Sequence, residues 1–257
     1  MKAVSELPDP TAGTINDYER QLLQTKEREK NSWYLLRGWA LQLCPNTLTL
    51  FAASSGHGKT LLVCQFIRNA LAQGKSVAFF GNEEKEADIY GRLKELYRED
   101  LKELHEAMGE GRLSLSCQDF CKEYVNLPRM IERYLHFDVV VVDQLNYLAD
   151  SGDGSTPVEL FRAIPKFLDS LKTHINGEKD CPAFICTQQM SAPEPNKKGV
   201  MEPNRWNLEA LLKDSKRGIF NYTHTLMYAW DSFNGVGHIN LGKSGRGSLD
   251  TVVGRYE

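Results

Sequence analysis

Apolar residues in this chain form short unbroken runs, separated by segments with helical spacing. Thr47–Ala53 and Ser76–Phe80 are two such runs, and Lys59–Gln73 between them has apolar residues at helical intervals. Gly74 is expected to end that helix, because glycine readily takes the left-handed backbone found there. Strands that are apolar at every position are typical of a parallel sheet covered on both faces. The pattern therefore predicts a strand–helix–strand unit of an α/β fold.

The rest of the chain continues the alternation. Lys85–Gly109 is charged and predicted to be helical, and Leu127–Phe137 is predicted to be a further helix. The remaining expected strands are rich in apolar and β-branched residues: Leu113–Ser116, Asp138–Val142, Ala183–Thr187, Thr225–Trp230, Gly237–Leu241 and Asp250–Tyr256. We predict an α/β fold with a central, mostly parallel sheet flanked by helices and closed by a C-terminal antiparallel hairpin.

The N-terminal 34 residues differ from the remainder. Residues 1–13 are rich in proline, glycine and small polar residues, and Thr14–Lys30 has the pattern of a charged helix with few apolar positions. We expect residues 1–34 to form an arm and linker helix, and residues 35–257 to form one α/β domain. The arm either stays solvated or docks on a neighbouring subunit.

Charge and composition narrow the function classes. With 41% hydrophobic and 25% charged residues the chain should fold as a globular protein, and its formal net charge of −3 provides no general attraction for a polyanion. Contact with nucleic acid would therefore depend on local basic loops. The sequence has no apolar run long enough to span a membrane and no signal-peptide pattern, so we expect a cytoplasmic protein, in a bacterium or in the host cell of a virus. The six cysteines are expected to be free thiols.

The segment Ala53–Thr60 (Ala-Ser-Ser-Gly-His-Gly-Lys-Thr) fits the phosphate-binding loop, with alanine in place of the first glycine of the strict pattern. Backbone N–H groups in such a loop, backed by the positive end of the helix dipole, can hold phosphates. Lys59 would reach the terminal phosphates of ATP, and the Thr60 hydroxyl would bind Mg²⁺. The nucleotide-binding residues are expected to be Ser54, Ser55, Gly56, His57, Gly58, Lys59 and Thr60.

Polar residues follow three of the expected strands. Asp143 follows the strand Asp138–Val142 and is predicted to hold the Mg²⁺ shell. Glu83 and Glu84 follow another strand; we favour Glu83 as the base that orients the attacking water, and expect the other acid to cap a helix. Gln188 follows the strand Ala183–Thr187 and is placed to sense the γ-phosphate.

Two basic segments are candidate contact sites. The loop Met190–Trp206 contains Lys197, Lys198 and Arg205, and it is the best candidate surface for a nucleic-acid backbone. Lys243 and Arg246 lie in the glycine-rich connection between the last two strands. That connection is either a hairpin turn with solvated charges or a source of arginine-finger groups for the ATP site of an adjacent subunit.

Taken in order, these residues resemble the ATPase domain of the DnaB-family replicative helicases, in the RecA-like superfamily. The resemblance covers roughly residues 35–257 and favours the compact viral type, because the large helical N-terminal domain of bacterial members has no counterpart here. Lys243 and Arg246 have two residues between them, whereas the basic pair of the family usually has one. The resembling segments are Ala53–Thr60, Phe79–Glu83, Val139–Asp143, Thr187–Gln189 and Asn207–Ser215, with Lys243 and Arg246.

The resemblance implies a hexameric ring that hydrolyses nucleoside triphosphate at subunit interfaces and moves along single-stranded DNA. Glu83 would then be the catalytic base, Gln188 the γ-phosphate sensor, and Lys243 and Arg246 the groups supplied by the neighbouring subunit. A separate helicase loader or primase would be a further partner. Two other functions stay open: a recombination ATPase that forms filaments on single-stranded DNA, and an ATPase that acts on protein partners.

Overall fold

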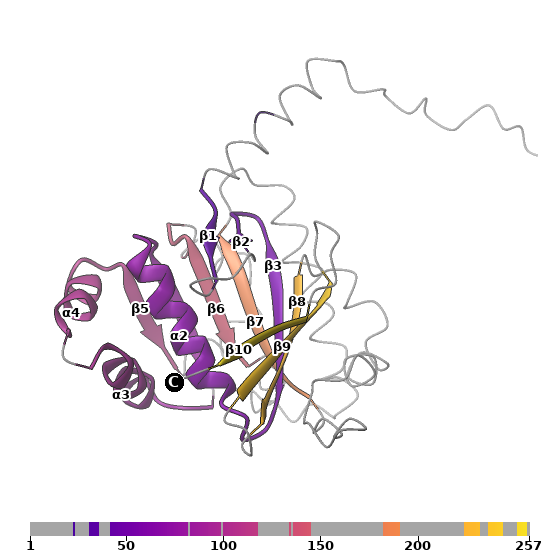
Figure 1. The fold of residues 1–257 in the computed structure, drawn as a ribbon. Coiled ribbons are helices and arrows are strands. Elements are labelled where there is room, and N and C mark those ends of the chain that lie inside the picture. The colour runs from indigo at the N-terminus through magenta and orange to yellow at the C-terminus, as the bar shows by residue number, and fades with distance from the viewer. Residues whose placement is uncertain are drawn as a thin grey trace, which may run out of the picture.

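The protein is built on one large twisted sheet (Figure 1). The computed structural model describes residues 23, 31–35, 42–81, 83–98, 100–117, 134, 136–144, 182–190, 224–231, 236–243 and 251–255. Its eight strands lie in the order β10–β9–β8–β3–β7–β6–β4–β5. In chain order they are β3 (Leu48–Ser54), β4 (Val77–Gly81), β5 (Leu113–Ser116), β6 (Val139–Asp143), β7 (Ala183–Met190), β8 (His224–Asp231), β9 (Val236–Lys243) and β10 (Thr251–Arg255).

The six strands from β8 to β5 are parallel, and β9 and β10 extend the sheet with antiparallel pairs. Every residue of β3, β4 and β6 is buried, as expected for central strands without a polar face. The predicted mostly parallel α/β sheet is therefore confirmed.

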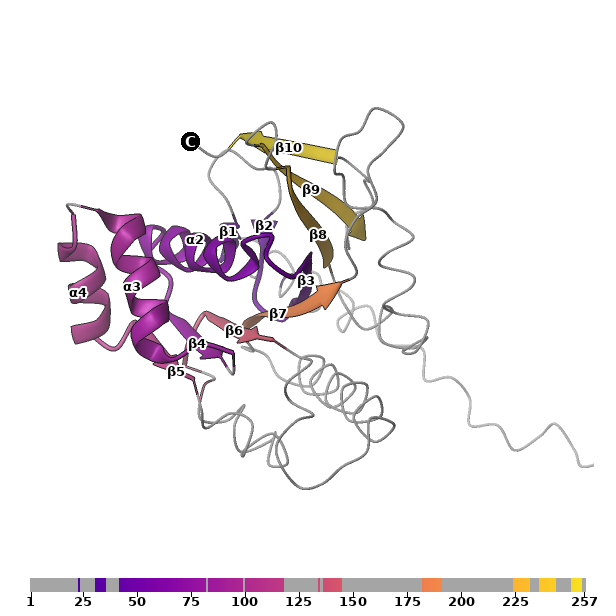
Figure 2. The ribbon, with the colours of Figure 1, turned by 90° about the horizontal axis from the view of Figure 1, so that it is seen from below.

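The described helices lie on the side of the sheet that carries α2 (Lys59–Ala72) (Figure 2). Beside β4 and β5 lie α3 (Glu86–Tyr97) and α4 (Lys102–Gly109). The prediction of one helical segment from Lys85 to Gly109 was wrong in detail, because the chain breaks at Arg98, which has a φ of 51°. A positive φ is incompatible with the α-helical backbone, so α3 ends there.

The core between α2 and the sheet is aromatic and aliphatic. Phe51 of β3 and Phe66 of α2 are almost fully buried, and their rings meet edge to face at 5.3 Å. Tyr228 of β8 adds a third ring, 6.1 Å from Phe51. Edge-to-face contacts of this kind add roughly 1 kcal/mol beyond the burial of apolar area. This packing holds α2 against β3.

The register of β4 and β6 is set at their amino-terminal ends. The Asp138 carboxylate accepts hydrogen bonds from the N–H and the hydroxyl of Ser76, both at 2.8 Å, and the Ser76 hydroxyl in turn accepts from the Asp138 N–H at 3.0 Å. With these ends joined, Gly81 pairs with Asp143 at the other end of the two strands. The residues that follow β4 and β6 therefore emerge next to each other.

A small two-stranded sheet, β1 (Trp33–Tyr34) and β2 (Gln42–Leu43), packs near α2. The Gln73 side chain accepts a hydrogen bond from the Tyr34 N–H and donates one to the Tyr34 carbonyl, as a neighbouring strand would. Trp33 and Leu35 are both buried in the main core. The core thus includes residues on each side of the predicted boundary between residues 34 and 35.

The expected helix Thr14–Lys30 lies outside the described residues except for Leu23, and Leu127–Phe137 is described only at its C-terminal end. None of the helices in the described part of the chain combines the length and the apolar character needed to cross a membrane.

Candidate functional site

The loop between β3 and α2 contains two glycines with a left-handed backbone. Gly56 and Gly58 have φ values of 76° and 79°, in the left-handed region that favours glycine. A Cβ atom at either position would meet no atom within 4 Å, so the backbone conformation, and not crowding, requires glycine there. Ser55, Gly56 and Gly58 are exposed. The outer side of the loop is thus accessible to a ligand, at the N-terminus of a helix.

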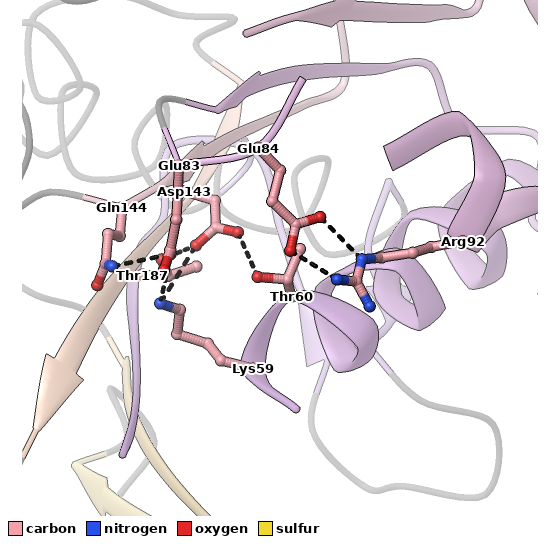
Figure 3. Close-up of polar contacts among 8 residues, drawn as sticks. All are labelled: Lys59, Thr60, Glu83, Glu84, Arg92, Asp143, Gln144 and Thr187. Carbon is pink, nitrogen blue, oxygen red and sulfur yellow. Dashed lines mark hydrogen bonds and ion pairs between the residues drawn. The ribbon is translucent and has the colours of Figure 1, made fainter. Parts of the chain in front are cut away.

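Lys59 points from the start of α2 towards two carboxylates at the end of the sheet (Figure 3). Its Nζ lies 3.6 Å from Asp143 Oδ1 and 3.7 Å from Glu83 Oε2. The Lys59 side chain is only 10% exposed. A cation at this depth needs compensating charge, and the two carboxylates provide it.

Asp143 is held by hydroxyl groups from two other elements. The Thr60 hydroxyl of α2 donates to Asp143 Oδ2 at 3.0 Å, and the Thr187 hydroxyl of β7 donates to Asp143 Oδ1. The carboxylate is 3% exposed and joins the loop, β6 and β7. Asp143 is linked to Gln144 by a cis peptide bond.

The two adjacent glutamates have different partners. Glu83 Oε2 accepts a hydrogen bond from the Gln144 side chain at 2.9 Å, and the Glu83 side chain is 42% exposed. Glu84 accepts two hydrogen bonds from the Arg92 guanidinium of α3, at 2.6 and 2.8 Å. Figure 3 shows the two carboxylates directed to different sides, with Glu83 towards Lys59 and Glu84 towards α3.

The expectation that one of these glutamates caps a helix was wrong. Helix α3 begins at Glu86, and Asp88 in its first turn accepts the hydrogen bond from the Lys85 N–H at 3.3 Å. Glu84 instead forms a bidentate ion pair with Arg92, which suits the planar geometry of the guanidinium. The hydrogen bond from Arg92 to Glu84 raises the pKa of Arg92, so the guanidinium stays charged.

Burial shifts the pKa of other groups around the site. It lowers the pKa of His57 in the loop, which favours the neutral imidazole. On α2, burial raises the pKa of Cys64 to about 12; Arg92 opposes this shift, whereas Asp143 and Glu84 add to it. Cys64 is therefore a protonated thiol at neutral pH and has no nucleophilic character there.

The donor set fits Mg²⁺ bound together with phosphate oxygens. Among the described residues no group of three or more His, Cys, Asp and Glu side chains could hold a metal ion by itself. Thr60 and Asp143 would provide one hydroxyl and one carboxylate, and Mg²⁺ is commonly held by one or two such groups, with waters and substrate phosphates completing its shell.

The remaining predicted residues are less completely defined. Gln188 lies in β7 beside Thr187 and pairs with Ala52 of β3. The predicted end of that strand at Thr187 was too early, because pairing with β3 continues to Met190. Lys243 ends β9 opposite Thr225, near the start of β8. Arg246, Lys197, Lys198 and Arg205 lie outside the described residues.

Sequence reasoning did not identify Thr187, Gln144 or Arg92 as parts of the site. Thr187 and Gln144 could have been found from the sequence. Each is a polar residue at the end of an apolar strand and is adjacent to a residue that was already a candidate. Arg92 had no such signal, because it is one of several charged residues in the segment Lys85–Gly109, which was predicted only to be charged and helical.

Comparisons with known proteins show the fold. No protein-family model matches the chain, and no curated protein matches it. Among solved structures it is similar to the KaiC-like protein PH0186 from the hyperthermophilic archaeon Pyrococcus horikoshii OT3, with a TM-score of 0.55 and 17% identity over 82% of this chain and 86% of that one. The fold is thus of the RecA-like α/β type.

Proposed function

We propose that this protein is an ATP hydrolase that uses Mg²⁺ and couples hydrolysis to movement along single-stranded DNA. One observation carries the ATP hydrolase part. Lys59 and Thr60 both contact Asp143 beside the loop that contains Gly56 and Gly58, and Glu83 Oε2 lies 3.7 Å from Lys59 Nζ. Lys59 and Thr60 are neighbours in the sequence, but Glu83 and Asp143 come together only because β4 and β6 are adjacent strands.

The loop and Lys59 would bind the phosphates of ATP. Backbone N–H groups at the start of α2 supply directed donors, and the helix dipole favours negative charge at that point. Lys59 is buried at the base of the loop and carries a positive charge towards the site. Binding of a triphosphate would draw this ammonium into contact with its oxygens.

Thr60 and Asp143 would hold Mg²⁺. The bound ion would neutralise charge on the transferred phosphoryl group. Asp143 is suited to this role because hydroxyl donors from Thr60 and Thr187 fix both of its oxygens. Its carboxylate is thereby oriented before any ligand binds, which lowers the cost of ordering the site.

Glu83 would orient and deprotonate the attacking water. It follows β4, at the same edge of the sheet as Asp143, and its 42% exposure leaves room for water. Its neighbour Glu84 is a weaker candidate, because both of its oxygens are bound by Arg92. The assignment of Glu83 as base thus gains support from the partners of the adjacent residue.

The DNA-related part of the proposal is supported by the order of motifs and by the fold. We propose a homo-oligomeric ring, with hexamers as the expected form, in which Lys197, Lys198 and Arg205 contact DNA. Lys243 and Arg246 would act on the ATP site of the neighbouring subunit. Lys243 pairs with Thr225 at the amino-terminal end of the parallel strands, whereas the phosphate loop follows their carboxyl-terminal end. This placement is compatible with Lys243 contacting the phosphate loop of another subunit. A loader or primase would be a further partner.

An ATPase assay with and without single-stranded DNA tests both parts. We expect Mg²⁺-dependent turnover that rises on addition of DNA. Glu83→Gln should retain nucleotide binding and lose turnover by roughly 10²-fold or more, because it keeps the size of the side chain and removes the base. Normal turnover in Glu83→Gln would contradict the assignment of the base.

Particle images of the same samples distinguish the alternatives. Closed rings agree with the proposal, and filaments on DNA would favour the recombination ATPase. Turnover that is indifferent to DNA would contradict movement on DNA and favour an ATPase that acts on protein partners.

A further inference from the structure

The residue directly after Asp143 connects the candidate metal site to the candidate base. Gln144 is 1% exposed, and its Nε2 donates a hydrogen bond to Glu83 Oε2 at 2.9 Å. The two residues are 61 positions apart in the sequence and meet because β4 and β6 are neighbouring parallel strands. A buried side chain is confined to few rotamers, so this amide is a fixed donor.

A hydrogen-bond partner restricts the side chain of Glu83 more than it would that of Asp143. Asp143 is buried and bound on both oxygens, whereas the Glu83 side chain is 42% exposed and has three rotatable bonds. An exposed glutamate loses considerable rotamer freedom when it is held in one geometry. For a base, that geometry decides whether a water can be aligned with the phosphorus atom.

The contacts of Glu83 also distinguish its two oxygens. In the described part of the chain, the hydrogen bond from Gln144 and the ion pair with Lys59 both involve Oε2. Glu84, one residue later, is fixed by Arg92 at both of its oxygens. The ion pair of Glu84 with Arg92 thus anchors the backbone next to Glu83. The Glu83 side chain can still rotate, and the hydrogen bond from Gln144 limits that rotation.

We propose that Gln144 is the positioning residue for Glu83: its amide holds Oε2 and leaves Oε1 as the oxygen that accepts the proton from water. This inference rests on the proposed function, because it takes Glu83 as the base. Gln144 follows Asp143 directly, so a single strand end, β6, sets the metal carboxylate and the geometry of the base together.

The main test is Gln144→Met, which keeps the length and volume of the side chain and removes the amide donor. We expect kcat to fall about 10- to 100-fold, because a misplaced base loses alignment. KM and the Kd for a non-hydrolysable ATP analogue should change less than about threefold, since the substitution leaves the phosphate-binding groups in place. A rise in KM and Kd with unchanged kcat would overturn the proposal.

Gln73→Met is the matched control. Gln73 also uses its amide in hydrogen bonds, to Tyr34, but it lies at the far end of α2 from the loop. This variant should lower the melting temperature and leave kcat within about twofold. An equal fall of kcat in both variants would show a general effect of destabilisation and would contradict a specific role for Gln144.

A double-mutant cycle separates positioning from a structural role. Glu83→Asp keeps a carboxylate but shortens the side chain by one methylene, so it can no longer reach Gln144. In that background Gln144→Met should lower kcat by less than about twofold, because the contact is already lost. A full 10- to 100-fold further loss would overturn the proposal.

Two further outcomes separate the role of Gln144 from the proposed function. If Gln144→Met does not fold, Gln144→Asn carries the same prediction, because its amide is one methylene too short to reach Glu83. Absence of turnover and nucleotide binding in the wild type would contradict the proposed function itself. Normal wild-type turnover with unchanged kcat in the variants would contradict only the role of Gln144.

Discussion

Asp138, which directly precedes β6, and Asp143, its last residue, make similar bonds in different surroundings. At the amino-terminal end, Asp138 is exposed and accepts hydrogen bonds from the hydroxyl and N–H of Ser76 on the neighbouring strand. At the carboxyl-terminal end, Asp143 is buried and accepts from the hydroxyls of Thr60 and Thr187. The type of bond is the same, but among the described residues Asp143 also has an ammonium group nearby, that of Lys59.

The polarity of the parallel sheet explains the difference. At carboxyl-terminal ends the chain leaves the strands and enters loops and helix N-termini, so directed N–H groups and side chains collect there. At the amino-terminal ends of β4 and β6, Ser76 and Asp138 bond directly to each other, and these bonds align the two strands. A hydroxyl–carboxylate bond is thus structural at one edge and, by the proposed function, part of a metal site at the other.

Matched alanine substitutions would give the largest contrast. Asp143→Ala should lower kcat by about 10²- to 10³-fold, because it removes the carboxylate proposed to bind Mg²⁺ and an electrostatic partner of Lys59. Steady-state ATPase rates at saturating Mg²⁺ would measure this. A loss smaller than about tenfold would mean that the two ends of β6 do not differ in function.

Buried cysteines test whether either substitution opens the fold. Burial raises the pKa of Cys64, Cys117 and Cys186 to about 12 each. At pH 8 their labelling should be at least about 100-fold slower than that of the half-buried Cys44, because only the thiolate reacts. Peptide mapping after timed alkylation would measure the four sites separately.

The pH dependence of these thiols has a defined sign. Unfolded cysteines ionise near pH 8.5, before the buried ones, so the folded state retains protons that the unfolded state has lost. Their contribution to stability is present below about pH 8.5 and is lost as the pH rises towards 12. Rapid labelling of Cys64 at pH 8 in the native protein would contradict the packing of α2 on the sheet.

Asp138→Ala should have the smallest effect. It removes the hydrogen bonds that Ser76 donates and should lower the free energy of unfolding by about 1 kcal/mol, since those bonds are exposed. Chemical denaturation would measure this change, and kcat should stay within about twofold of the wild type. A large loss of kcat at unchanged stability would show that strand alignment at this end controls the site.

Much of the fold could be predicted because the local signals agree with the global arrangement. The run Val139–Val142 is β-branched at every position, and β6 was placed within one residue of its observed bounds. Glycines at 56 and 58 marked the loop, and both adopt the left-handed backbone that glycine favours. Arg98 gave no such signal, since an arginine rarely takes a positive φ, and the break between α3 and α4 was missed.

The site was predictable only where one residue type implies one kind of chemistry. Lys59 and Thr60 follow from the motif, and Asp143 and Glu83 follow from strand ends. The position of Gln144 at a strand end was a usable signal, but its contact is with Glu83, 61 residues away, which periodicity cannot reveal. The different contacts of Glu83 and Glu84 involve Gln144 and Arg92, which likewise come from other parts of the chain.

Nucleotide binding by the wild type and by Lys59→Ala is the most direct test of the central claim that this loop and this lysine hold a triphosphate. Isothermal titration with a non-hydrolysable ATP analogue and Mg²⁺ should show one site per chain in the wild type. Affinity should fall at least about 100-fold in Lys59→Ala, because a buried, charge-assisted contact is lost. Equal affinity in the two proteins, or no binding in a correctly folded wild type, would contradict the account.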